Sequence, residues 1–371
     1  MAERAYGGCA RYIQRDGELD RVGQHAATLG TSALLIVDGF ILERYGERLR
    51  KSFSGAGVDV AMERFSGECW TGEVERLCAI AGQATVQTIV AVGGGKTADT
   101  AKLVAMQLGA RLMIVATIAS SDAPTSAIAM RYHEDGSTDR SVYLPRHPDF
   151  VIVDPRLVVE APVRFLVAGM GDALTTWYEA RANRDAGTRN YIAGGYPAPI
   201  AGLAIARQCH ETLMRDGRAA KIAAENGRLT PAVQNVIEAN TLLSGLGFEN
   251  CGCSIAHGFH NGMSILPQTH GMLHGEKVAY GALVLLVMEG RPNEEIEEAF
   301  AFCEDIGLPT TLADLGLGEA SEEELAKGAL AALGDNEPTH STTAELSVEN
   351  LLAAVHTVDA LGRKRRDAKA R

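Results

Sequence analysis

The sequence lacks the features that mark membrane, secreted or nucleic-acid-binding proteins. Its apolar runs all fall short of the ~20 residues that span a bilayer, and the opening "MAERAYGG" lacks the apolar stretch of a signal peptide. Seven cysteines occur without a C-x-x-C pair, so we expect neither a disulfide framework nor a thiolate zinc site. A net charge of -12 disfavours polyanionic partners. We therefore expect a cytoplasmic protein that binds neither nucleic acid nor membrane.

What is present indicates two domains, of which the first contains a parallel sheet. The chain has 371 residues, too many for one ordinary domain. Short apolar runs predict strands at 32–39, 86–94, 111–120 and 149–155. Between the second and third, apolar residues at helical spacing predict a helix that ends at Gly109. Strand, helix and strand in this order favour a parallel sheet covered by helices.

From Val163 onward the sequence is typical of helices. Thr230 stands directly before a proline, and Ser321 comes three residues before a glutamate, two patterns that begin helices. The closing "RKRRDAKAR" is expected to be a solvated, frayed tail. We predict a sheet domain at 1–162 and an all-helical domain at 163–371, with the active site in the cleft between them.

The stretch "VAVGGGKTADT" at 90–100 indicates phosphate binding. An ATP-type P-loop would need glycine at position 90, where the chain has Val90, and the dinucleotide fingerprint has Ala98 in place of its third glycine. Consecutive glycines still let the backbone approach a ligand, and the helix that follows offers its N–H groups to an anion. A tight turn without a ligand is the alternative.

Asp38 favours a dinucleotide over ATP. It ends the first predicted strand, where a carboxylate can accept hydrogen bonds from both ribose hydroxyls and repel a 2′-phosphate. That would select NAD over NADP. The alternative is a turn formed by Asp38 and the glycine that follows it.

Four of the ten histidines, His257, His260, His270 and His274, form a cluster that indicates a metal site. If the segments are helical, the first two share one face, and so do the last two. Imidazole pairs of this kind suit Zn²⁺ or Fe²⁺. Spacing alone does not say which of the four are ligands.

Two aspartates are further candidates. Asp172 lies in an apolar run, where a carboxylate must be paired or bound to a cation. Its alternative role is the N-cap of a helix that starts at Ala173. Asp122 follows the third predicted strand. It either forms part of a turn or belongs to a site at the carboxyl ends of the strands.

Together these segments resemble a known family. "GGGKTADTAK", "TIASSDAPTSA", "VAGMGDALTTWYEARA", "IEANTLLSGLGFEN", "AHGFHNG" and "HGEKVAYG" are similar to the glycerol dehydrogenases, metal-dependent members of the iron-containing alcohol dehydrogenase superfamily. The similarity is collinear from about Tyr12 to Leu317. It implies a Rossmann-like sheet domain and a helical-bundle domain of the dehydroquinate synthase type. It also implies NAD, zinc (with Fe²⁺ as an alternative) and a homo-oligomer.

The resemblance assigns roles to individual residues. Its metal ligands correspond to Asp172, His257 and His274, which together with Asp122 would be the catalytic residues. Asp122 would lie near the substrate hydroxyls and the nicotinamide. The implied cofactor-binding residues are Asp38, Gly94, Gly95, Thr117, Ser120, Ser126, Ile128 and Tyr132.

The implied reaction is the reversible, NAD-dependent oxidation of glycerol to dihydroxyacetone, with related vicinal diols as further substrates. The rivals with this fold, 3-dehydroquinate synthase and glycerol-1-phosphate dehydrogenase, take anionic substrates that call for several basic residues. Here the metal segments offer only Lys277. A further histidine ligand, His260 or His270, would suit a four-ligand iron alcohol dehydrogenase, and either is a candidate proton relay.

A non-catalytic nucleotide-binding protein is the alternative from another class. Val90 and the histidine cluster argue against it. Cys251 and Cys253 stand where the family usually has small residues, so they would narrow the substrate pocket or make the enzyme sensitive to oxidation.

Overall fold

The computed structural model describes residues 3–83, 85–134 and 136–369. The chain divides into two compact units. The sheet unit comprises residues 7–162 and 227–229, and the helical unit comprises 1–6, 163–226 and 230–371. Each is described by itself.

The sheet unit is built on six parallel strands in the order β1-β8-β5-β4-β2-β3. They are β1 (Tyr12–Gln14), β2 (Ser32–Val37), β3 (Asp59–Arg64), β4 (Thr88–Gly93), β5 (Arg111–Ala116) and β8 (Phe150–Val153). A separate antiparallel hairpin joins β6 (Ile128–Tyr132) and β7 (Thr138–Tyr143). The four predicted strands are confirmed as β2, β4, β5 and β8. The sequence analysis missed β1, β3 and the hairpin.

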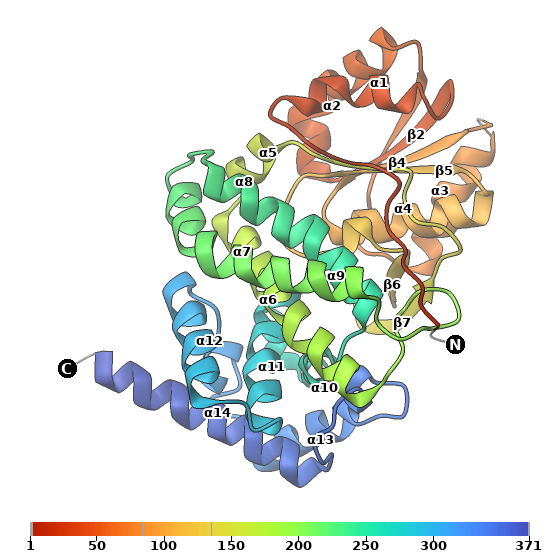
Figure 1. Ribbon diagram of the computed structural model, residues 1–371. Coiled ribbons are helices and arrows are strands. Elements are labelled where there is room, and N and C mark those ends of the chain that lie inside the picture. Colours follow the sequence, from red (N-terminus) through yellow and green to blue (C-terminus); the bar gives the residue numbers. More distant parts are fainter. Residues whose placement is uncertain (1–2, 84, 135, 370–371) are drawn as a thin grey trace. The chain divides into compact units, whose positions relative to one another are not determined.

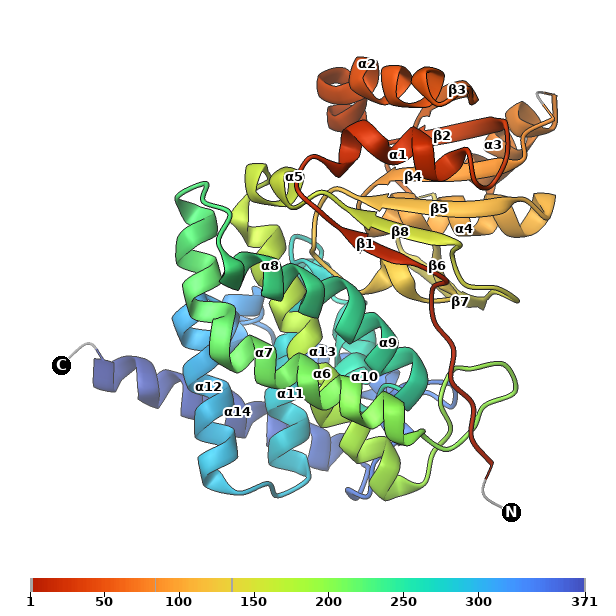
Figure 2. The ribbon, with the colours of Figure 1, turned by 45° about the horizontal axis from the view of Figure 1, so that its top comes forward.

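Helices cover both faces of this sheet. They are α1 (Val22–Ala26), α2 (Gly39–Gly55), α3 (Thr71–Gln83), α4 (Gly95–Leu108) and α5 (Pro155–Glu160). Leu35 and Val37 of β2 pack with α1 and α2, whereas Leu34 and Ile36 pack with α3 and α4. Figures 1 and 2 show these two helix pairs on opposite sides of the strands. Because both faces of a parallel strand are buried, its sequence is a nearly continuous apolar run.

The helical unit confirms the all-helical prediction for the second half. Its helices are α6 (Val163–Ala186), α7 (Ile200–Glu225), α8 (Pro231–Glu238), α9 (Ser244–Cys251), α10 (Ile255–Met263), α11 (His274–Met288), α12 (Asn293–Ile306), α13 (Glu322–Ala332) and α14 (Val348–Lys369). A π-helical turn, Ala239–Leu243, joins α8 to α9. Thr230 and Ser321 cap α8 and α13 as predicted, because their hydroxyls accept from the N–H of Val233 and Glu324. The fold class, a Rossmann-like sheet with a helical domain, is confirmed.

The fraying expected of the tail is wrong as far as Lys369, whereas the expected exposure holds for most of its side chains; Ala370 and Arg371 lie outside the described residues. Helix α14 continues to Lys369, and three of its basic residues, Arg365, Arg366 and Lys369, are paired with acidic residues of other elements. Arg365 donates to Glu304 at 2.7 Å, and Arg366 donates to Asp314 at 2.6 Å. These partners lie far back in the sequence, so local charge alone could not predict them.

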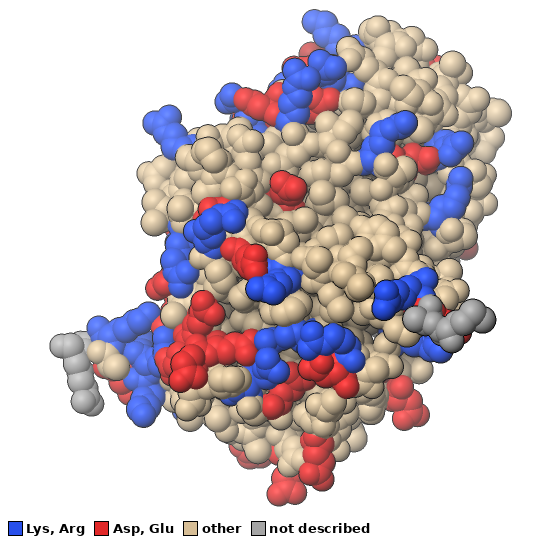
Figure 3. Space-filling view, viewed as in Figure 1, with Lys and Arg blue, Asp and Glu red and all other residues tan. Residues whose placement is uncertain are grey.

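The surface carries both signs of charge. On the face drawn in Figure 3, acidic and basic side chains are interspersed rather than gathered by sign. Exposed ion pairs of the helical unit include Arg218–Asp305 at 2.6 Å and Arg207–Glu211 at 2.8 Å. Among the described residues, no helix is both long and apolar enough to cross a membrane.

Candidate functional site

Asp172 is a buried carboxylate in the middle of a helix. It lies within α6, which starts nine residues earlier at Val163 and continues past Ala173, so the alternative role as an N-cap is wrong. Only 1% of the Asp172 residue surface is exposed. An ionised group in such a place needs a cationic partner.

Two histidines supply partners for Asp172. His257 of α10 places Nε2 3.6 Å from Asp172 Oδ1, and His274 at the start of α11 places Nε2 3.2 Å from the same oxygen. One donor atom from each of the three residues lies within 4.8 Å of the other two. Donors about 2.1 Å from a tetrahedral ion lie roughly 3.4 Å from each other. The three side chains therefore fit a divalent metal ion in both chemistry and spacing.

Glu179, about two turns after Asp172 on α6, orients His257. Its Oε2 lies 2.7 Å from Nδ1 of His257, and its Oε1 accepts from the backbone N–H of Ser254 and His257 at 2.8 and 3.0 Å. With Nδ1 protonated toward this carboxylate, Nε2 keeps its lone pair for a metal. Glu179 is fully buried.

His260 contacts Nδ1 of His274, as Glu179 contacts Nδ1 of His257. Its Nε2 lies 2.9 Å from Nδ1 of His274, and its Nδ1 lies 3.1 Å from the hydroxyl of Ser264. Lys277 donates to that hydroxyl at 2.7 Å. His260 therefore contacts a candidate ligand instead of joining the ligand group. The expected pairing of His270 with His274 on one helix is wrong, because His270 is exposed and precedes α11.

The electrostatics of the group favour a charged Asp172. Burial alone would raise the pKa of this carboxyl, but the charge of His274 and hydrogen bonds from His257 and His274 outweigh burial and lower it. Burial would lower the pKa of His257, but the Cys253 thiol, Glu179 and Asp172 raise it well above its ordinary value. The proton that His257 holds beside Asp172 is one that a bound cation would replace.

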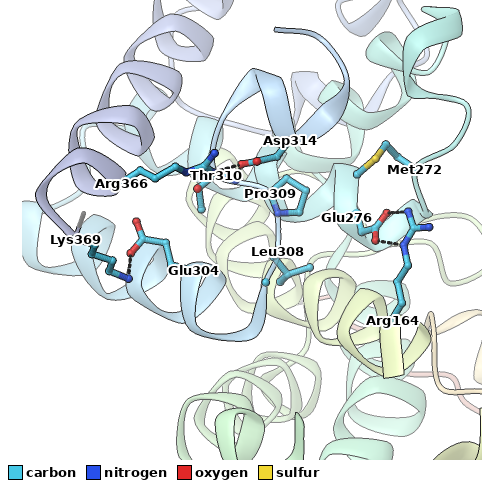
Figure 4. Close-up of a pocket in the computed structure, with 11 residues that line it drawn as sticks. Arg164, Met272, Glu276, Glu304, Leu308, Pro309, Thr310, Asp314, Arg366 and Lys369 are labelled. Atoms are coloured by element: carbon cyan, nitrogen blue, oxygen red, sulfur yellow. Dashed lines mark hydrogen bonds and ion pairs between the residues drawn. The ribbon is translucent and has the colours of Figure 1, made fainter. Parts of the chain in front are cut away.

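An ion pair fixes the loop that leads into His274. Arg164 of α6 donates to both carboxylate oxygens of Glu276 at 2.6 and 2.7 Å and to the carbonyl of Gly271 at 3.1 Å. Glu276 in turn accepts from the N–H of Leu273 at 2.7 Å, which caps the start of α11. Figure 4 shows this pair at the wall of a cavity of about 540 Å³. The other cations drawn there, Arg366 and Lys369, are paired with Asp314 and Glu304.

The two cysteines near the histidines differ in their surroundings. Cys253 contacts His257, and its Sγ lies in a second group of close donor atoms with Glu179. Cys251 is buried against Ala180 and Ala206. Burial raises the pKa of the Cys251 thiol to about 12, which leaves it protonated and unreactive at neutral pH.

The sheet unit gathers most of the predicted cofactor residues at one edge. Asp38 follows β2, Gly94 and Gly95 follow β4, and Thr117 and Ser120 follow β5. These three strands are neighbours, and the carboxyl ends of neighbouring parallel strands meet at one edge. Asp38 also acts as the N-cap of α2, since its Oδ1 accepts from the N–H of Phe40 at 2.9 Å and of Ile41 at 3.5 Å. Asp38 can therefore cap α2 with Oδ1 and still offer Oδ2 to a ribose hydroxyl.

Side chains of the neighbouring loop lie close to the glycines at this edge. A side chain at Gly94 would meet Ile118 at 2.9 Å, and one at Gly95 would meet Ser121 at 3.2 Å. Gly94 is the N-cap of α4, and no side-chain cap forms at this helix start.

The remaining predicted residues of the sheet unit lie on the segment that follows β5. Asp122 precedes a short 3₁₀ turn, Ala123–Thr125, and is buried. Ser126 follows that turn, while Ile128 and Tyr132 are the two ends of β6. Burial raises the pKa of the Tyr132 hydroxyl, with nearby acidic groups adding to the effect.

The comparisons with known proteins point to one family. The model of the iron-containing alcohol dehydrogenases matches residues 9–155. A glycerol dehydrogenase of Thermotoga maritima is 43% identical over 96% of this chain and 97% of its own. Two solved structures cover nearly all of both chains. They are a "probable glycerol dehydrogenase" of Sinorhizobium meliloti (51% identity, TM-score 0.94, 98% of this chain and 100% of that chain) and the glycerol dehydrogenase of Schizosaccharomyces pombe (35%, 0.95, 100% and 94%). The chain therefore belongs to the iron-containing alcohol dehydrogenase family, among the glycerol dehydrogenases.

Proposed function

We propose that this protein oxidises glycerol to dihydroxyacetone with NAD as the hydride acceptor, reversibly and with a divalent metal ion. The observation that carries the proposal is the group formed by Asp172, His257 and His274, whose donor atoms have the spacing of metal ligands. Membership of the glycerol dehydrogenases gives the reaction.

Each proposed residue has one task. Asp172, His257 and His274 would hold the metal, for which we propose zinc and keep iron(II) as the alternative. When bound, such a cation lowers the pKa of an alcohol and stabilises the alkoxide from which hydride departs. Asp122 would accept a hydrogen bond from a substrate hydroxyl and so orient the diol.

The cofactor would be held by the edge of the sheet. The first turn of α4, which has Gly94 as its N-cap and no side-chain cap, suits the pyrophosphate. Because both backbone contacts of Asp38 use Oδ1, a ribose hydroxyl would meet Oδ2. We assign Thr117, Ser120, Ser126, Ile128 and Tyr132 to the rest of the dinucleotide.

A neutral substrate fits the charges near the histidines. Lys277 donates to Ser264, and Arg164 is committed to Glu276, so the basic residues close to the histidine segments already serve other groups. A phosphorylated or carboxylated substrate would call for further cations. This favours a polyol over the anionic substrates of the related enzymes.

The decisive experiment follows NADH formation from glycerol at alkaline pH, before and after chelation and after addition of Zn²⁺ or Fe²⁺. We expect chelation to abolish the activity and Zn²⁺ to restore it, with D172N inactive in every case. Glycerol 1-phosphate serves as the rival substrate in the same assay. Activity that survives chelation, or that prefers the phosphate ester, would overturn the proposal.

We further propose that the protein acts in the cytoplasm as a homo-oligomer. The support is composition and kinship with metabolic enzymes. Sedimentation velocity over a range of protein concentrations tests the oligomer: a single species with the mass of one chain would contradict it.

A further inference from the structure

Lys102 is a lysine with no exposed surface, and it belongs to the sheet unit. It lies on α4, among the small residues Ala98, Ala101 and Ala105, and 0% of its surface is accessible. Lysine is almost never fully buried unless its ammonium group is satisfied by partners. We therefore looked for the groups that the ammonium group of Lys102 binds.

The ammonium group of Lys102 binds one segment of the chain. It donates to the carbonyls of Ala123 at 2.6 Å and Ile128 at 2.5 Å, and to the hydroxyl of Ser126 at 3.3 Å. A fourth contact, at 3.2 Å, goes to Oδ1 of Asp99, one turn earlier on the same helix.

Asp99 binds the same segment as Lys102. Its Oδ2 accepts from the N–H of Met130 at 3.1 Å. The buried pair thus ties both the 3₁₀ turn and the start of β6 to the middle of α4. The same segment is also held by the carbonyl of Ala127, which accepts from the N–H of Leu144 at 2.7 Å, and by the pairing of β6 with β7.

The segment carries residues on which the proposed cofactor site depends. Ser126 and Ile128 belong to the assigned dinucleotide contacts, and Asp122 directly precedes the turn. Helix α4 also begins at Gly95, the assigned pyrophosphate position. One rigid helix therefore carries Gly95 at its first turn and Lys102 two turns later, so Lys102 sets the distance between the two parts of the dinucleotide site.

We propose that Lys102 is a positioning residue for NAD, which holds residues 122–128 in their cofactor-binding conformation without touching the cofactor. The inference rests on the proposed function, because it assumes that this segment meets a dinucleotide. The inference adds to the proposed cofactor site a residue that binds this segment through two of its carbonyls and one of its hydroxyls.

The test compares zinc-loaded wild-type protein with K102M. Loss of a buried charged hydrogen-bond donor would loosen the segment that it holds, so we expect the Kd and KM for NAD to rise by about tenfold or more. The kcat at saturating NAD should change much less. Hydrogen exchange of residues 122–130 should speed up without NAD and slow down again when NAD is added.

Two further variants separate positioning from general damage. D99N/K102M removes the carboxylate that K102M leaves without its cation, so it keeps the test readable if the single variant unfolds. R181M removes another buried cation, the partner of Glu295 at 2.5 Å in the helical unit, and should lower the melting temperature without changing the Kd for NAD.

Equal NAD affinity in wild type and in the folded Lys102 variants would overturn the inference. So would an R181M variant that weakens NAD binding as much as K102M does, because the effect would then follow stability alone. Failure of the wild-type protein to bind NAD at all is a different result, which overturns the proposed function instead.

Discussion

At the scale of single residues, the orientation of His257 depends on one carboxylate. Glu179 receives two backbone N–H groups on Oε1 and faces the imidazole Nδ1 with Oε2. In E179Q, the amide oxygen would keep the two backbone contacts, and the NH₂ group would turn to His257. It would then donate to Nδ1 and force the ring proton onto Nε2, the atom assigned to the metal. We expect zinc affinity to fall by about 10- to 100-fold, as measured by competition with a chelator.

E289Q is the matched control for this change. Glu289 is another partly buried carboxyl of the helical unit, and it accepts from the hydroxyl of Thr342 at 3.1 Å. The substitution has the same chemistry but acts away from the histidines, so zinc affinity should stay at the wild-type value. If E179Q and E289Q bind zinc equally well, Glu179 does not orient His257.

Asp172 and Glu179 also show how far residue-level prediction reaches. Asp172 stands out in the sequence because a lone acid interrupts an apolar run. Glu179 does not, because "WYEARA" is typical of a solvated helix face, and its burial arises from the packing of α10 across the chain. The network of His260, Ser264 and Lys277 likewise forms only when the loop before α11 folds back onto α10. Ligand types were predictable, while their orienting partners depend on tertiary contacts.

At the scale of elements, the site needs α6 and α11 to approach very closely. A side chain at Gly275 would lie 1.8 Å from the carbonyl oxygen of Ala168, and one at Gly171 would lie 2.4 Å from that of Gly275. These glycines stand beside Asp172 and His274. G275A must therefore push the helices apart or strain them, which costs about 1–3 kcal/mol or more. We expect a lower free energy of unfolding in urea together with weaker zinc binding.

G82A is the control for the glycine substitution. Gly82 is an exposed residue of α3, and a side chain there would meet nothing within 4 Å. Alanine favours the helix over glycine by up to about 1 kcal/mol, so this variant should be as stable as wild type or slightly more so. A G275A protein with unchanged stability and zinc affinity would show that the helices are not constrained at this contact.

The elements that were predicted and those that were missed differ in burial. Strands β2, β4, β5 and β8 are almost fully buried, and their apolar runs are visible without any alignment. Strand β3 is an edge strand of sequence DVAMER with half-buried residues, and β1 has three residues. Their pairing with neighbouring strands, not their own pattern, makes them strands. The hairpin of β6 and β7 lies outside the main sheet and gave no alternation strong enough to predict it.

At the scale of the whole molecule, the two proposed ligands, the metal ion and NAD, would bind to different units. The three proposed metal ligands belong to α6, α10 and α11 of the helical unit, whereas the assigned dinucleotide residues belong to the sheet unit. A ligand stabilises the state that binds it by about 2.7 kcal/mol at a concentration of 100 times its Kd. Zinc should therefore protect the helical unit, and NAD should protect the sheet unit.

Hydrogen exchange with mass spectrometry can separate the two effects. Chelation should speed up exchange in α6, α10 and α11 and leave the strands β2, β4 and β5 unchanged. Addition of NAD to the chelated protein should slow exchange at residues 93–97 and 117–132, because the sheet edge of Asp38 and Gly94 is complete without the metal. If chelation loosened the strands as much as the histidine-bearing helices, the metal would not reside at Asp172, His257 and His274. If NAD protected nothing until zinc returned, the sheet edge alone would not be the dinucleotide site, and the assignment of Asp38, Gly94 and Gly95 would have to be abandoned.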